Sequence, residues 1–369
     1  MRFEFVGVVL VVSAGFLRFL VLSARTSPRP LLMSSFSRLL PVLGVRSAEI
    51  SYPTGSKSFS VLQGFPAAFS AEEADPFLMC DEFGPTVSPG VVRDEDEFPI
   101  GWHPHRGQDL LTYMIKGVGR HGDSMGNRET FSSPGMQWIN AGSGIEHAEG
   151  GGTPLGEEMH GFQIWVNVPS QLKMEDPAYG THSESEIPLY VAKDGEVKVR
   201  VLAGAFEAED FSGTGPFQTK VSVQMLDVTV QAGAKFEYNL PSLYDNLLVY
   251  CYGKGGQGGM INGEPIKGGS IARLDASSDA RSLSLSASQS AVTCLVFAGK
   301  KLNQKIAWHG PFVMTTDDEI RQTLMEYRSG IFLKKRAPWD YRRISSAPAG
   351  TYTNGVNSVK SDSKSSGEL

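Results

Sequence analysis

Short apolar segments, separated by turns that contain glycine or proline, dominate the chain from about residue 50 to residue 300. Residues 110–115 and 136–140 are apolar runs rich in strand-forming side chains, and turn signals at 117–119, 125–127 and 133–135 interrupt the chain around them. The chain turns roughly every 8–12 residues and shows no long helical period, which is typical of a sandwich or a barrel. The pattern therefore predicts an all-β protein.

A second β-rich region begins near residue 197 and repeats part of the first. The run Leu-Leu-Thr-Tyr-Met-Ile-Lys-Gly at 110–117 compares with Leu-Leu-Val-Tyr-Cys-Tyr-Gly at 247–253, an offset of 137 residues. This offset is too long for a solenoid, whose repeats are about 20–50 residues. Two duplicated barrels explain it, with the polar stretch around 170–196 as their connection.

One helix is expected near the C-terminus. Thr316 and Glu319 fit a capping box, and Ile320, Leu324 and Tyr327 fall on one helical face. The residues after about Ser345 are rich in Ser, Gly, Asn and Lys, so that tail is expected to be disordered. The predicted domains are a first barrel at 49–180, a second barrel with the helix at 181–335, and a tail at 336–369.

Residues 1–48 differ in composition from the rest of the chain. They contain six Arg and only one acidic residue, Glu4, so they carry a net charge of +5 and leave −11 for the remainder. An apolar core at 6–17 and an Arg- and Ser-rich stretch after Ala24 resemble a signal peptide followed by a transit peptide. We expect this segment to direct the protein to an organelle and to pack on nothing.

Two alternatives for this segment stay open. Residues 5–24 are long enough to anchor the protein in a membrane, with Arg18 as a costly member. Alternatively Met33 is the true start, and the protein then belongs in the cytoplasm or the nucleus.

Charge and cysteine content exclude several classes. The formal net charge of −6 gives no electrostatic footprint for direct nucleic-acid binding. The three cysteines, Cys80, Cys251 and Cys294, are far apart in sequence and contain no CxxC pair, so a disulfide framework or a zinc knuckle is not expected. The apolar content of 41% is ordinary for a globular protein.

Two short pairs of polar residues carry the candidate chemistry. His103 and His105 are spaced i, i+2, and so are His147 and Glu149. On a β-strand such residues point to the same face. If the two segments are neighbouring strands of the first barrel, three imidazoles and one carboxylate converge, a donor set that suits Fe, Mn, Ni, Cu or Zn. His121 either lies behind the metal ligands and supports them or is a solvent-facing turn residue, and the second interpretation is favoured; His160 is interpreted as a structural residue. The second barrel has no histidine between His182 and His309 and is expected to hold no metal.

These motifs resemble the pirin family, two-domain members (bicupins) of the cupin superfamily. The resemblance covers about 50–335 and rests on these segments: His103-Pro-His-Arg-Gly107, Pro134-Gly-Met-Gln-Trp138, Ala141-Gly-Ser-Gly-Ile-Glu-His-Ala-Glu149, and the flanking runs 75–83, 160–167 and 310–314. It implies two tandem cupin-type β-barrels with a short C-terminal helix. It also implies Fe(II), or another divalent transition metal, as the cofactor bound by His103, His105, His147 and Glu149. The chain departs from the usual pattern at Gln108 and Asp109, where pirins usually have an apolar residue and Glu, and near Pro134, where it is one residue shorter.

The resemblance implies two functions of different classes. One is a metal-dependent oxidoreductase, a dioxygenase of the quercetinase type, in which Glu149 acts as the general base on a small aromatic, flavonol-like substrate and O₂ is consumed. The other is a non-enzymatic, iron-dependent redox sensor that coregulates transcription through a regulatory protein partner. A monomer is expected in either case.

Overall fold

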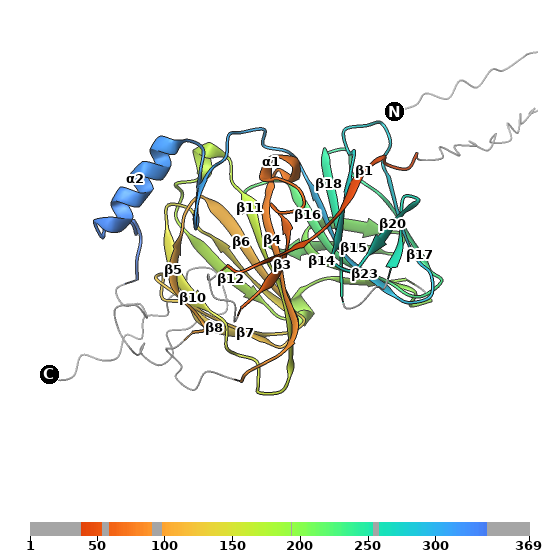
Figure 1. Ribbon diagram of the computed structural model, residues 1–369, viewed down its shortest axis with the longest axis horizontal. Helices are drawn as coiled ribbons and strands as arrows, with labels where there is room; N and C mark the ends of the chain where they lie inside the picture. The colour runs from red at the N-terminus through yellow and green to blue at the C-terminus, as the bar shows by residue number, and fades with distance from the viewer. Residues whose placement is uncertain (1–37, 54–58, 91–97, 193, 254–257, 338–369) are drawn as a thin grey trace, which may run out of the picture. The chain divides into compact units, whose positions relative to one another are not determined.

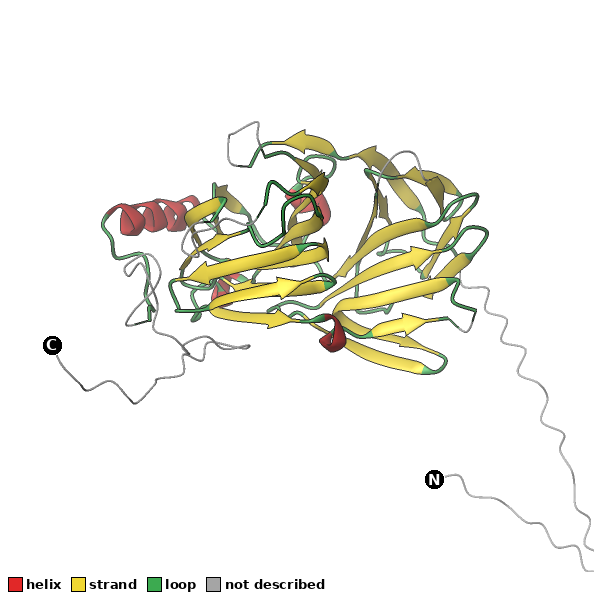
Figure 2. Ribbon diagram, turned by 90° about the horizontal axis from the view of Figure 1, so that it is seen from below, coloured by secondary structure: helices red, strands yellow, loops and turns green. Residues whose placement is uncertain are grey.

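Antiparallel strands account for most of the computed structural model, which describes residues 38–53, 59–90, 98–192, 194–253 and 258–337. Figure 2 shows how small the helical share is. Within these ranges no helix has the length and apolar character needed to cross a membrane. The expected targeting segment, up to residue 37, lies outside the described residues.

The first barrel is built from a seven-stranded sheet and a four-stranded sheet. The large sheet has the order β12-β9-β6-β11-β4-β3-β2, and the small one has the order β5-β10-β7-β8. Their bounds are β2 Glu49–Ser51, β3 Val61–Phe65, β4 Phe77–Val87, β5 Ile100–His105, β6 Gln108–Lys116, β7 Val118–Asp123, β8 Arg128–Ser132, β9 Gly135–Asn140, β10 Ile145–Glu149, β11 Glu158–Asn167 and β12 Ala178–His182. The short helix α1, Ala71–Ala74, precedes β4, and the single turns η1, Ser170–Leu172, and η2, Glu184–Glu186, flank β12.

The second barrel repeats this plan. Its large sheet has the order β1-β21-β18-β23-β16-β14-β13, with β15 also paired to β14, and its small sheet has the order β17-β22-β19-β20. The bounds are β1 Val42–Ser47, β13 Leu189–Val191, β14 Val197–Ala208, β15 Phe211–Pro216, β16 Val223–Val230, β17 Lys235–Asn239, β18 Asn246–Tyr252, β19 Gly258–Ile261, β20 Glu264–Lys267, β21 Ser270–Leu274, β22 Ser282–Ala287 and β23 Val292–Gly299. The predicted all-β fold of two barrels is confirmed.

The beginning of the described chain belongs to the second barrel. Figure 1 shows β1 among the strands of the second barrel, where it pairs antiparallel with β21. Leu40, only 1% exposed, lies in the apolar core of that barrel. The expectation that residues up to 48 pack on nothing is therefore wrong for 38–48. Val42, Gly44 and Arg46 of this segment supply the backbone groups that complete an edge of the sheet, which composition alone does not reveal.

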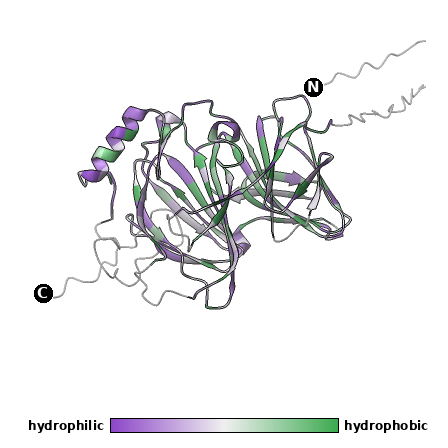
Figure 3. Ribbon diagram, viewed as in Figure 1, coloured by the Kyte–Doolittle hydropathy of each residue, from purple (hydrophilic) through white to green (hydrophobic). Residues whose placement is uncertain are grey.

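The end of the described chain returns to the first barrel. Strands β24, Ala307–His309, and β25, Phe312–Met314, form a hairpin, and helix α2, Asp317–Arg328, follows it. The predicted short helix is confirmed, since Thr316 caps α2 and Glu319 closes the capping box. Figure 3 shows both hydrophilic and hydrophobic residues along this helix. The predicted start of the tail, at residue 336, is too early, because the Ala337 N–H donates to the Ser124 carbonyl. Residues 338–369 lie outside the described chain.

The two barrels share a core that contains a buried polar cluster. The hydroxyls of Tyr113 and Tyr252 both donate to the Asp227 carboxylate. Glu82 accepts from the Tyr250 hydroxyl at 2.6 Å and lies 2.7 Å from His160 Nε2. Because each of these carboxylates has two partners, the cluster is a satisfied structural element, in keeping with the structural interpretation of His160.

Asp81 on β4 is a buried acid whose protonation should affect stability. Burial raises its pKa to about 7, against the hydrogen bond that it accepts from Gln63 at 2.9 Å. Between about pH 4 and 7 the folded protein then binds more protons than the unfolded chain, so the stability falls as pH rises through this window. For this group alone the fall is about 4 kcal/mol.

The substitution Asp81→Asn should remove this dependence, because an amide keeps the acceptor oxygen and does not titrate. Urea unfolding of metal-free protein at a series of pH values measures it. Wild type should lose on the order of 4 kcal/mol more than Asp81→Asn between pH 4 and 7. The exposed Asp279→Asn should follow wild type. Parallel curves for wild type and Asp81→Asn would show that Asp81 is ionised in the folded protein throughout.

Candidate metal centre

The two histidine-containing segments are neighbouring strands of the small sheet in the first barrel. Strands β5 and β10 pair antiparallel, and His147 lies directly opposite His103. His105 is two residues further along β5 and therefore faces the same side. The adjacency expected from the spacing of these residues is present in the structure.

The three imidazoles lie close together. One ring nitrogen from each of His103, His105 and His147 lies within 4.8 Å of the other two. The ring centroids are 4.3 Å apart for His103 and His147, and 4.9 Å apart for the other two pairs. Within the described part of the chain, these three residues form the one group of His, Cys, Asp or Glu side chains that lie close enough together to hold a metal ion.

The hydrogen bonding of these rings leaves nitrogen atoms available. His147 is fully buried and neither of its ring nitrogens has a partner, and the buried Nε2 of His105 has none either. His103 uses Nδ1 to donate to the Gly101 carbonyl at 2.8 Å, which leaves Nε2 with a lone pair. Buried polar atoms without partners are rare in proteins and need an explanation. A divalent transition ion supplies one, since imidazole nitrogens are its common ligands.

Burial also keeps these rings in the form that a metal requires. It lowers the pKa of both His105 and His147 well below the ordinary histidine value, and the neighbouring His103 lowers them further. Both rings are therefore neutral at neutral pH. Because a metal binds the deprotonated nitrogen, these two rings can bind it without first releasing a proton.

Glu149, the fourth predicted ligand, lies inside the same barrel but outside the group within 4.8 Å. The register of β10 and β5 shifts between His147 and Glu149, so the residue opposite Glu149 is Ile100. Its carboxylate accepts a hydrogen bond from Gln137 Nε2 at 3.2 Å. Burial raises the pKa of Glu149, against the His103 and His121 rings, which lower it. The structure thus brings three of the four predicted residues together and holds the fourth as a half-buried carboxylate on the same strand as His147.

A row of polar side chains crosses five adjacent strands of the large sheet and leads to Glu149. The members of this polar belt are Gln63, Asp81, Gln163, Thr112 and Gln137, each paired with the next across neighbouring strands. The Thr112 hydroxyl donates to Gln163 at 2.8 Å, and Gln137 donates both to Thr112 and to Glu149. The polar belt therefore holds the Glu149 carboxylate in position through the hydrogen bond from Gln137.

The second barrel has an apolar belt in the equivalent place. Thr112 on β6 corresponds to Val249 on β18 through the 137-residue offset. The strand pairing then matches the rest of the polar belt to Val201, Leu226, Val296 and Ala272. All five side chains are buried in one hydrophobic cluster. At these positions the second barrel therefore has apolar side chains where the first barrel has polar ones.

His121 occupies a place that the sequence interpretation missed. The favoured interpretation placed it in a solvent-facing turn, and the alternative placed it behind the metal ligands; it is fully buried on β7, directly opposite Glu149 on β10. Its Nε2 lies 2.9 Å from Asp123 and its ring stacks on Tyr179 at 4.3 Å. The favoured interpretation is wrong because the turn begins only after Asp123, so His121 is still part of strand β7. The spacing from His121 to Asp123, again i, i+2, is a signal that could have shown this.

The residues after His105 tie the site to the C-terminal segment. Gln108 Nε2 lies 3.1 Å from His105 Nδ1 and donates to the Pro311 carbonyl at 2.9 Å. The buried Lys173 donates to the carbonyls of Gly107 and Val313, at 2.7 and 3.1 Å. Sequence reasoning noted Gln108 only as a departure from the family pattern and did not identify Lys173.

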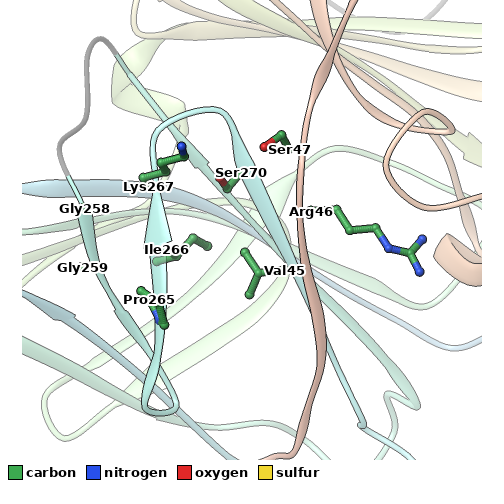
Figure 4. A pocket seen from close by; sticks show the side chains of 9 residues that line it. All are labelled: Val45, Arg46, Ser47, Gly258, Gly259, Pro265, Ile266, Lys267 and Ser270. Atoms are coloured by element: carbon green, nitrogen blue, oxygen red, sulfur yellow. The ribbon is translucent and has the colours of Figure 1, made fainter.

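A surface pocket of the second barrel carries no comparable chemistry. Figure 4 shows it between β1 and strands β19, β20 and β21. Arg46 is among its lining residues, but its side chain extends away and donates to the Ala68 carbonyl at 2.7 Å. The described lining contains no histidine, cysteine or carboxylate. The histidine group of the first barrel is therefore the candidate functional site.

Comparison with known proteins agrees with this arrangement. Residues 58–166 match the Pirin family model, and residues 225–333 match the model of the Pirin C-terminal cupin domain. Pirin-like protein 2 of Arabidopsis thaliana is 34% identical over 69% of this chain and 75% of its own length. A Pseudomonas aeruginosa protein, named provisionally as a quercetin 2,3-dioxygenase, is 35% identical over 71% of this chain and 88% of its own.

A solved structure shows the same fold. The crystal structure of quercetin 2,3-dioxygenase from Acinetobacter baumannii superposes with a TM-score of 0.69 and 27% sequence identity, over 80% of this chain and 98% of that one. Both barrels are accordingly cupin domains, and the predicted bicupin architecture is confirmed. This chain belongs to the pirin family.

Proposed function

We propose that the protein is a metal-dependent dioxygenase that cleaves a flavonol of the quercetin type. The observation that carries this proposal is the group of three imidazoles, two of them buried with unpartnered nitrogens, together with the half-buried and hydrogen-bonded carboxylate of Glu149. The names of the Pseudomonas relative and of the Acinetobacter structure support the choice of substrate. Iron(II) is the proposed ion, held by His103, His105, His147 and Glu149.

The protein groups have separate tasks in this scheme. The three histidines would hold the ion, which would supply Lewis acidity toward the flavonol oxygens and a means to engage O₂. Glu149 accepts the proton of the flavonol hydroxyl. Burial raises the pKa of its carboxyl, which makes it a stronger base than an exposed glutamate. Gln137 holds the carboxylate in place through its hydrogen bond.

The substitution Glu149→Gln tests the role of the base. An amide oxygen can still coordinate weakly, so the variant should keep most of its metal. An amide cannot accept the flavonol proton at neutral pH, so turnover should fall by about 10²–10⁴-fold. Metal content is measured by mass spectrometry, and quercetin loss and O₂ uptake are followed together. The exposed Glu158→Gln provides a matched control and should behave as wild type.

The outcomes separate the parts of the proposal. Iron-loaded wild type should consume quercetin and O₂ together, and a chelator should stop both. Equal rates for wild type and Glu149→Gln would show that Glu149 is not the general base and that the metal acts without it. If the loaded protein is no faster than free iron in buffer, the dioxygenase proposal fails.

A further inference from the structure

Two of the three cysteines face each other inside the second barrel. Cys251 on β18 lies directly opposite Cys294 on β23, in the antiparallel ladder that joins these two central strands. Both side chains are 1% exposed and belong to the apolar cluster of that barrel. Cys80 belongs to a different cluster and lies opposite Phe65 and Ile164 on its neighbouring strands. The pair is therefore separate from Cys80 and from the histidine group.

The backbone hydrogen bonds show which type of cross-strand pair this is. The Cys251 carbonyl accepts from the Gly269 N–H at 2.8 Å, so it points toward the next strand, away from Cys294. The Tyr252 carbonyl points the other way and accepts from the Thr293 hydroxyl at 2.9 Å. Cys251 and Cys294 are therefore a non-hydrogen-bonded pair, the class in which opposite Cα atoms lie only about 4.5 Å apart. This separation falls within the range of about 4.4–6.8 Å that a disulfide bridges.

The surroundings of the two sulfur atoms favour a disulfide bond between them over metal binding. The neighbouring Cys251 thiol and burial both raise the pKa of Cys294, so both sulfur atoms are held as neutral thiols in the apolar core. The cross-strand neighbours on the outer sides are Val228 and Ser270, and neither cysteine belongs to a metal-binding group of the described residues. Joining the sulfur atoms removes two weakly polar S–H groups from an apolar core and leaves no buried group unpaired.

We propose that Cys251 and Cys294 form a reversible cross-strand disulfide in the second barrel. A small-molecule disulfide, such as oxidised glutathione, is the oxidant. One cysteine thiolate attacks it and releases one small thiol, and the second cysteine then displaces the other small thiol from the mixed disulfide. One S–S bond forms and one is broken, and the two protein thiols pass two electrons and two protons to the oxidant.

The bond would cross-link the part of the second barrel that supports the first one. Strands β18 and β23 present Tyr250 and Phe297 to the core that the two barrels share, on the face opposite the two cysteines. The link closes a loop of more than 40 residues, which restricts the unfolded chain. The oxidised protein should accordingly be the more stable form.

Thiol trapping on the full chain tests the proposal. Protein is equilibrated in glutathione buffers of increasing oxidised fraction with mild urea, which permits local opening around the buried thiols. Reduced, unfolded chain is refolded in the same buffers, so that equilibrium is approached from both sides. Acid quenching, alkylation of the unfolded chain and peptide mass spectrometry then identify the free and bonded cysteines. We expect Cys251 and Cys294 to lose reactivity together and to give one cross-linked peptide, while Cys80 stays alkylated.

Substitutions identify the link. Cys251→Ser and Cys294→Ser should each abolish the cross-link, and Cys80→Ser should keep it. Oxidation should raise the Tm by several degrees in wild type and in Cys80→Ser, and in neither of the other two variants. Free thiols at both positions in fully oxidised buffer from both directions, separate glutathione adducts, or a link that includes Cys80 would each overturn the proposal.

Discussion

Replacing His147 with alanine is expected to abolish stoichiometric metal binding. His147 is the side chain that joins the two ligand strands, since it lies opposite His103 and its ring is 4.9 Å from that of His105. Without His147, only the two imidazoles of β5 remain from the group, and water would have to take the coordination position that His147 leaves. Loss of a residue that only hydrogen-bonds to a metal ligand costs about 10–100-fold in metal affinity. Loss of a ligand itself should therefore lower the affinity by more than about 100-fold.

Metal content after equilibration with Fe(II) and removal of unbound ion measures this result. The exposed His309→Ala is the matched control and should bind as wild type does. The metal-free form of His147→Ala should stay folded, because the ring that it loses makes no hydrogen bond in the protein. A folded His147→Ala that retains one ion per chain would place the metal elsewhere and remove the basis of the proposed function.

The pairing of the two ligand strands could be predicted from the sequence, because strand geometry turns i, i+2 spacing into a common face. This rule alone predicts that His103 and His105 face the same side of their strand, and a neighbouring strand then brings His147 close to them. The place of Glu149 could not be predicted in the same way. A shift in register after His147 moves it relative to β5, and such irregularities depend on the whole sheet rather than on local residue types.

The duplication shows a second limit of the sequence pattern. The 137-residue offset correctly matched β6 with β18, and the alternation places Leu111 and Leu248 in the same shared core. The difference between the two barrel interiors follows from a few positions in that alignment. The difference between the polar and the apolar interior can be recognised only when the residues opposite Thr112 and Val249 on the neighbouring strands are known.

Contacts between distant parts of the chain were beyond prediction. Strand β1 joins the second barrel, while the segment from β24 onward packs on the first. Both contacts join residues more than 200 positions apart, and no periodicity within either segment indicates its partner. Arg106 is the clearest case, since within the His-Arg-Gly motif it looks like one more charged residue near the site.

Arg106 should instead be the residue that holds the C-terminal segment against the site. Its guanidinium is 1% exposed. It donates to the Ser143 carbonyl at 2.8 Å, to the Thr323 hydroxyl at 3.1 Å and to the Phe332 carbonyl at 2.9 Å. It also pairs with Glu326 at 2.8 Å and lies over the Phe332 ring at 4.4 Å. One side chain therefore joins the end of β5, the turn before β10, and helix α2.

The charge on Glu326 makes the pair costly to break. Burial alone would raise its pKa, but the ion pair with Lys334, the hydrogen bond from Gln322 and the ion pair with Arg106 lower it to about 2, so the carboxylate is ionised throughout the neutral range. Arg106→Ala leaves this charge with Lys334 as its remaining cationic partner and leaves two carbonyls and a hydroxyl without a donor. Breaking one partner of a buried ion pair typically costs about 3–5 kcal/mol.

We therefore expect Arg106→Ala to lower the free energy of unfolding by about 3–5 kcal/mol and to weaken metal binding by about 10–100-fold. Urea unfolding of metal-free protein measures the first effect and metal titration the second. Arg106→Lys should restore only part of each, because one ammonium group cannot reach all of these acceptors in the geometry of a guanidinium. Arg321→Ala, which removes an exposed arginine of the same helix, should change stability by less than about 0.5 kcal/mol. If Arg106→Ala loses stability but binds metal with unchanged affinity, the C-terminal segment supports the barrel and does not position the ligands.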